Sequence, residues 1–150
     1  MLAPDGLVLI AVPNFGSWQA RATGRFWLHL DLPRHLSHFT PDSVRLLLEA
    51  SGYEVIGQTF GEWEYDVVGW SQSLLNRFFR GGNAFFKRVS GRPGLGPVLR
   101  PRALFQLVMG LGLSATFLGF TWLENLLKRG GTLIVVARPS QPQVSVDAES

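Results

Sequence analysis

The chain has 150 residues, of which 46% are hydrophobic and 17% charged, and its formal net charge is +3. A chain of this length is expected to form one domain with a modest core. It has no cysteine, which excludes a disulfide framework, a zinc–thiolate site and a thiol nucleophile. No secretory signal is visible and the lack of cysteine is compatible with a reducing compartment, so a cytoplasmic location is expected.

The first predicted element is a buried strand. Residues 7–12 form a continuous apolar run, LVLIAV, that follows a turn at 4–6. Such a run is typical of a strand buried on both faces, as in a parallel sheet covered by helices. The strand is expected to end at Pro13, and a loop rich in aromatic residues follows over 15–39, with a short helix over 17–23.

A capped helix and a second strand are predicted after this loop. Thr40 can cap the helix, Pro41 suits its first position, and Asp42 complements the positive end of its dipole. The expected apolar stripe of this helix consists of Val44, Leu47 and Leu48. Gly52 is expected to end the helix, and residues 53–60 are predicted to form a strand.

The segment 61–129 is predicted to be a helical insertion that is both basic and hydrophobic. Helical spacing over 62–79 places five apolar side chains on one face: Trp63, Val67, Trp70, Leu74 and Phe78. Residues 83–102 mix aromatic and basic residues with glycine and proline, which predicts irregular structure. Residues 103–123 carry no charge and are numerous enough to cross a bilayer.

The chain is predicted to end with an apolar strand over 132–137 and a disordered tail over 139–150.

Five segments carry a resemblance to a known family: Leu2-Ala3-Pro4-Asp5-Gly6, Val12-Pro13-Asn14, the run HLDLPRHLSHFT at 29–40, the junction ASGYEV at 50–55, and Gly130-Gly131-Thr132. In these segments the chain resembles the C-terminal half of a class I S-adenosylmethionine-dependent methyltransferase of the small-molecule branch.

The resemblance implies a Rossmann-like α/β fold, with a partial methyltransferase domain over 1–60 and 130–138. It further implies a three-stranded mixed sheet in which the last strand is antiparallel and lies between the other two. The family's glycine-rich loop after the first strand, and the acidic residue that holds the ribose, have no counterpart in this sequence. We therefore expect S-adenosylmethionine to be held mainly by a missing N-terminal half, and this chain alone to be inactive.

Six residues are candidates for the acceptor side of such a site. His35 and His38 are the candidate catalytic bases, because histidine titrates near neutral pH. The candidate substrate-binding residues are Asn14, Trp27, Asp31 and Arg34. Arg34 can hold an anionic acceptor by a two-pronged contact. In the alternative interpretation His35 and His38 only orient the loop by hydrogen bonds, and Arg34 pairs with Asp31.

Two other interpretations of this loop stay open. His29 and Asp31 together with His35 and His38 have the ligand types for zinc or iron, but their spacing fits no known motif, so no metal is expected. The aromatic side chains Trp18, Phe26 and Trp27 either line a pocket for a ring or an isoprenoid chain, or belong to the core.

The hydrophobic insertion predicts a partner as well. No acidic residue lies between Asp66 and Glu124, and the glycines at 110, 112 and 119 allow a break into two shorter helices. We expect an in-plane or re-entrant hairpin at an anionic membrane surface. The alternative is a helical subdomain that packs on its own core or in a homodimer, and nucleic acid is not expected. The sequence thus predicts a methyltransferase that acts on a small, hydrophobic or lipid-linked acceptor. The alternative is a truncated, membrane-associated binding or assembly module.

Overall fold

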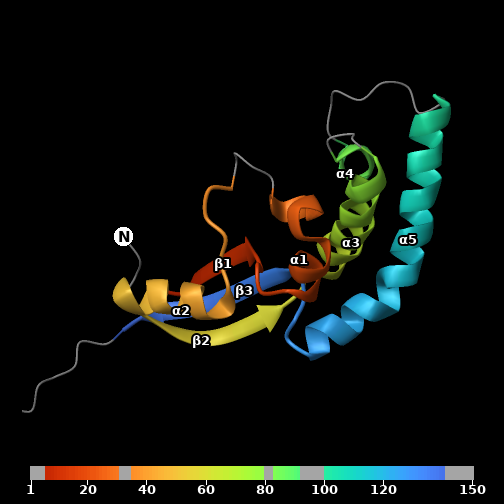
Figure 1. Cartoon of the computed structure of the whole chain (residues 1–150). Coiled ribbons are helices and arrows are strands. Elements are labelled where there is room, and N and C mark those ends of the chain that lie inside the picture. The colour runs from red at the N-terminus through yellow and green to blue at the C-terminus, as the bar shows by residue number, and fades with distance from the viewer. Residues whose placement is uncertain (1–5, 31–34, 80–82, 92–99, 141–150) are drawn as a thin grey trace, which may run out of the picture.

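The computed structural model describes residues 6–30, 35–79, 83–91 and 100–140. The elements in chain order are β1 (Val8–Pro13), α1 (Trp18–Thr23), two 3-10 turns (Gly24–Phe26 and Leu28–Leu30), α2 (Pro41–Ala50), β2 (Tyr53–Phe60), α3 (Trp63–Phe78), α4 (Ala84–Val89), α5 (Pro101–Leu126) and β3 (Thr132–Pro139). The molecule is a mixed α/β structure with two parts (Figure 1). The sheet carries α2, the helices α3, α4 and α5 stand beside it, and α1 lies between the two parts.

The described strands form one sheet in the order β1-β3-β2. β3 pairs antiparallel with both neighbours, and the ladder to β2 is interrupted by a register shift between Val55 and Gly57. The predicted strand order and the central antiparallel strand are confirmed. The expectation of a mixed sheet is wrong, because β1 and β2 run in the same direction but do not pair with each other.

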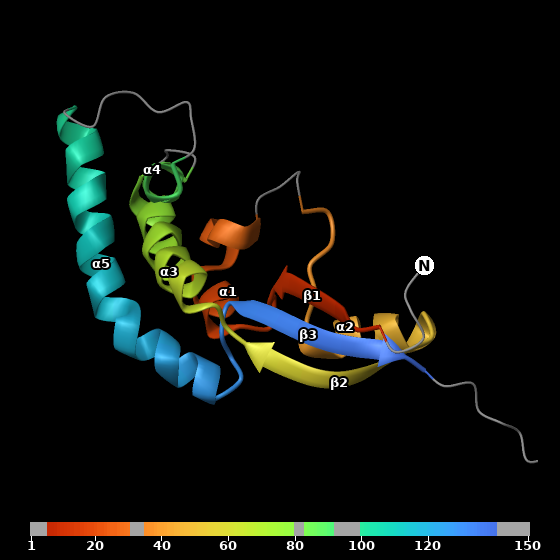
Figure 2. The ribbon, with the colours of Figure 1, turned by 180° about the vertical axis from the view of Figure 1, so that it is seen from behind.

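Helix α2 covers only one face of the sheet. Its residues Val44 and Leu48 pack against Leu133, Val135 and Ala137 of β3, and all five are buried. On the opposite face Leu9 of β1 is 69% exposed, and Figure 2 shows no helix of the described part over that face. The expectation that residues 7–12 are buried on both faces is therefore wrong. An apolar run identifies a strand, but it does not show what covers each face.

The start of α2 is built by two side chains that bond to each other's backbone. Thr40 Oγ1 accepts a hydrogen bond from the Ser43 amide at 3.3 Å, and Ser43 Oγ accepts one from the Thr40 amide at 2.8 Å. Pro41 occupies the first turn, as predicted. The expected apolar stripe is correct at Val44 and Leu48 but wrong at Leu47, which is exposed, because the neighbouring sheet contacts only the i, i+4 ridge.

Removing this cap should have a measurable effect on stability. Thr40→Ala should lower the free energy of unfolding by about 1 kcal/mol, because the Ser43 amide at the helix start loses its hydrogen-bond acceptor. The measurement is urea denaturation followed by circular dichroism. Thr116→Ala is the matched control, since the exposed Thr116 hydroxyl bonds only to Gly112 O of its own helix. Equal losses in the two variants would contradict the assignment of the cap.

The helical part consists of the long helices α3 and α5, which pack antiparallel, and the short helix α4, which contacts both. Trp70 of α3 stacks on Phe117 of α5 with ring centroids 5.1 Å apart, whereas Phe79 meets Phe105 at 5.9 Å. These contacts pair later residues of α3 with earlier residues of α5, so the helices run in opposite directions. Because α5 is a single helix, bent in Figure 1, the expected break into two helices is wrong.

Two further expectations about the insertion need correction. Residues Ala84–Val89 form α4 rather than irregular structure, because Phe85 is buried against α5. In α3 the predicted apolar face holds at Val67 and Trp70, but Trp63 and Phe78 are exposed. The helix instead buries four polar side chains, each bonded to a different neighbour. The Asp66 carboxylate accepts from Thr132 and the Ser71 hydroxyl bonds to Ser114 of α5. Gln72 accepts from Phe86 N of α4, and Ser73 accepts from Leu28 N.

Candidate functional site

The candidate site lies at the carboxyl end of β1, where the aromatic loop begins and ends. Phe15 N donates to Phe39 O at 2.8 Å, and Asn14 forms a bridge with Phe39, so the two ends of the loop lie side by side. Asn14 is buried, and its side chain donates to Gly130 O at 2.9 Å and accepts from Gly16 N at 3.0 Å. Through these bonds Asn14 holds the loop against the segment that leads into β3.

Four rings gather on this loop to form what we call the aromatic–histidine cluster: Phe15, Trp27, His29 and His38. Trp27 is buried at its centre, with ring centroids 6.0 Å from Phe15, 5.4 Å from His29 and 6.5 Å from His38. Phe15 and His38 contact each other at 5.4 Å. Because Phe15 is exposed and His38 half-buried, the cluster presents an aromatic surface with an imidazole at its edge.

Of the other predicted site residues, His35 is exposed, and Asp31 and Arg34 lie outside the described residues. Of the three aromatic residues proposed for an acceptor pocket, only Trp27 belongs to the cluster. Trp18 stacks on Phe120 of α5 at 5.9 Å, and Phe26 lies under the Arg25 guanidinium at 4.9 Å. Among the described residues, no group of three or more histidine and acidic side chains is arranged to hold a metal ion.

A chain of buried hydrogen bonds, which was not predicted from the sequence, connects the cluster to the helical part. Trp27 Nε1 donates to Gln19 Oε1 at 2.8 Å, and Gln19 Nε2 donates to the main-chain oxygen of Asp66 at 2.9 Å. The Asp66 carboxylate accepts from Thr132 Oγ1 at 3.1 Å. The position of Asp66 in the sequence was one indication of this buried network. Asp66 lies three residues after Trp63 and four before Trp70, so it falls on the predicted apolar stripe of the helix.

Two fully buried carboxyl groups lie where α3 and α5 meet the sheet. Burial raises the pKa of Asp66 from 3.8 to about 6, partly offset by its hydrogen bonds from Thr132 and Gly131. Burial also raises the pKa of Glu124 to about 7, although Trp70 Nε1 donates to its Oε2 at 2.7 Å. Since neither side chain has any solvent exposure, we assign both a structural role in the interior rather than contact with a substrate.

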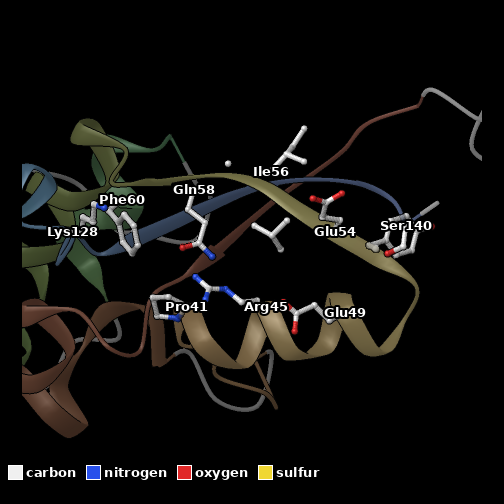
Figure 3. Close-up of a pocket in the computed structure, with 12 residues that line it drawn as sticks. Pro41, Arg45, Glu49, Glu54, Ile56, Gln58, Phe60, Lys128 and Ser140 are labelled. Atoms are coloured by element: carbon white, nitrogen blue, oxygen red, sulfur yellow. The ribbon is translucent and has the colours of Figure 1, made fainter. Parts of the chain in front are cut away.

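A groove of about 810 Å³ runs between α2 and β2 (Figure 3). Arg45 and Glu49 line it from the helix, and Glu54 and Gln58 from the strand. The close-up shows Arg45 pointing from α2 toward β2. None of the four predicted site residues that the structure describes lines the groove, and its lining mixes both signs of charge, so we do not propose it as the acceptor site.

Comparison of the chain with family models, with curated proteins and with solved structures finds no match. The features of the chain that bear on its function are therefore the geometry of the aromatic–histidine cluster and the order of the strands.

Proposed function

We propose that this chain supplies the acceptor side of an S-adenosylmethionine-dependent methyltransferase that acts on a small, hydrophobic or lipid-linked molecule. The observation that carries the proposal is the position of the aromatic–histidine cluster on the loop that leaves the carboxyl end of β1. Ligands of open α/β sheets bind outside the carboxyl ends of the strands. The order β1-β3-β2 with a central antiparallel strand supports it too, because the resemblance to class I methyltransferases implied this order.

The cluster has the chemistry to bind and activate such an acceptor. An aromatic ring or an isoprenoid chain would pack on Phe15 and Trp27, where aromatic contacts add to the gain from burial. His38 Nε2 lies 3.3 Å from Leu30 O, and a hydrogen bond to that carbonyl requires the proton on Nε2. Nδ1 then carries the lone pair, so it is the atom that would remove the proton of an acceptor hydroxyl.

The described residues do not fit the methyl donor itself. β1 is followed by buried Asn14, whose amide and carbonyl groups bond within the chain, rather than by a glycine-rich turn into a helix. We therefore propose that S-adenosylmethionine is bound outside the described part of this chain.

The proposal is tested by methyl transfer with the full chain isolated together with its native partners. Methyl-labelled S-adenosylmethionine and a lipid extract of the same cells are added, and label is counted in the organic phase. His38→Gln should reduce transfer about 100-fold, because a positioned general base contributes on this order. His35→Gln is the matched control and should leave transfer within about twofold, because His35 is exposed and distinct from the cluster.

Equal loss in the two histidine variants would overturn the role of His38. A preparation that transfers no label would overturn the proposal as a whole. In that case the second candidate, a non-catalytic membrane-associated binding or assembly module, would be favoured by the exposed apolar side of α5 described below.

A further inference from the structure

The outward side of α5 is an exposed apolar surface in the described part of the chain. The helix buries residues such as Ala103, Gln106 and Gly110 toward its neighbours. Its opposite side exposes large apolar side chains over its whole length, which we call the α5 outward face: Leu104, Val108, Leu111, Leu118 and Trp122. Only 11% of the most apolar 18-residue stretch of α5 is buried. Soluble monomers rarely expose a continuous apolar surface of this kind.

Basic side chains border this face at both ends. Arg100 and Arg102 are exposed at the start of α5, and Lys128 and Arg129 are exposed just after its end. No acidic residue lies between Asp66 and Glu124, and both of these carboxyl groups are buried. The exposed carboxylates at the start of α3 are Glu64 in its first turn and Glu62 just before it.

We propose that the α5 outward face docks in the plane of an anionic lipid bilayer. An apolar helix side with cations at its borders matches the interface of such a membrane, where acyl chains lie beneath negatively charged headgroups. Trp122, 69% exposed, lies near the end of the helix with its ring available to the headgroup region. This proposal does not depend on methyl transfer, since it concerns a different surface of the molecule.

The structure favours docking in the plane of the membrane over crossing it. α5 has 26 residues and is about 39 Å long, enough to span the hydrocarbon core. However, its antiparallel partner α3 carries Glu64, Asp66 and Arg77. Both ends of the insertion also return to the sheet, where Gly61 N donates to Thr132 O at 2.6 Å. A crossing by α5 would carry α3 with it and place these charged groups in hydrocarbon.

Charge also favours lipid over a second copy of the chain. Antiparallel packing of two α5 outward faces would place Arg100 and Arg102 of one copy beside Lys128 and Arg129 of the other. Parallel packing would place each basic end beside itself. Neither arrangement supplies the negative charge that anionic headgroups supply to all four side chains.

The test is flotation of the full chain with vesicles, in which aggregated protein stays at the bottom of the gradient. Vesicles of phosphatidylcholine alone are compared with vesicles that also contain phosphatidylglycerol. The chain should float with the anionic vesicles, and flotation should decrease with added salt. Lys128→Gln should weaken binding about fivefold, because one basic residue near the surface contributes about 1 kcal/mol.

A pair of matched variants distinguishes binding through the α5 outward face from non-specific binding to vesicles. Val108→Glu places a charge in the middle of the face, where valine is 59% exposed, and should reduce flotation at least tenfold with an unchanged circular dichroism spectrum. Leu46→Glu makes the same kind of change on α2, where leucine is 65% exposed, and should float like the unmodified chain.

Three results would overturn the proposal. The first is a chain that stays at the bottom with anionic vesicles at low salt, and the second is a Val108→Glu variant that floats unchanged. The third is a stable dimer in sedimentation analysis that Val108→Glu dissociates, without any flotation of the unmodified chain, because a second copy would then occupy the face.

Discussion

Replacing Phe85 with alanine should lower the free energy of unfolding by about 3–5 kcal/mol, the range for removing a buried phenylalanine ring. Phe85 is 1% exposed and is the largest fully buried side chain of the described part. Its ring lies directly over Gly110 of α5, so close that a β-carbon on Gly110 would overlap it. The loss should appear in urea denaturation as an earlier midpoint, with the helical signal most affected because Phe85 joins α4 to α5.

A phenylalanine of the same insertion provides the control. Phe78 is 75% exposed at the end of α3, so Phe78→Ala should change stability by less than about 0.5 kcal/mol. Gly110→Ala should destabilise as well, despite the better helix propensity of alanine, because its methyl group meets the Phe85 ring. If Phe85→Ala and Phe78→Ala were equally stable, the packing of α4 on α5 would be refuted.

Stability should increase as the pH falls from 8 to 5. The pKa of Asp66 is about 6 in the folded chain against 3.8 as its ordinary value, and that of Glu124 is about 7 against 4.5. The folded state therefore binds more protons than the unfolded state between about pH 4 and 7, so the free energy of unfolding decreases as pH rises through this window. Each group accounts for about 3 kcal/mol over the full window.

Neutral side chains of the same shape should remove this dependence. In Asp66→Asn the carboxamide oxygen can still accept from Thr132 and Gly131, while the cost of burying a charge disappears. Asp66→Asn combined with Glu124→Gln should be more stable than the unmodified chain at pH 8 and nearly as stable at pH 5. The measurement is the urea midpoint at several pH values.

The control for this experiment is Glu54→Gln, which alters an exposed carboxylate paired with Arg138 at 2.9 Å. Its effect should stay below about 1 kcal/mol and leave the slope against pH intact. A double variant of Asp66 and Glu124 that keeps the unmodified pH profile would show that neither group changes its pKa on folding.

The local signals of the sequence predicted the elements whose formation depends on neighbouring residues. Thr40 and Pro41 marked the start of α2, and the apolar run at 132–137 marked β3 to within two residues. Caps and apolar runs are formed by residues that are close together in the sequence, so their meaning changes little with tertiary context.

The candidate site was predicted only in part, for a related reason. Three histidines close together in the sequence indicated a common loop, but only the fold shows that His38 packs near Trp27 while His35 faces solvent. Gln19 and Asp66 were missed because their hydrogen bond joins residues 47 positions apart. Sequence spacing carries no information about such a partner until the helices are placed.

The sequence by itself determined the capped helix, the three strands, the charge-free stretch that became α5 and the loop that carries the histidines. The resemblance to a methyltransferase supplied the order of the strands. The tertiary structure alone decided which faces are covered, because burial depends on what packs against an element rather than on its own pattern. It left the outer side of β1 and the α5 outward face open, and it enclosed Asp66 and Glu124, whose pKa values rise because water is excluded.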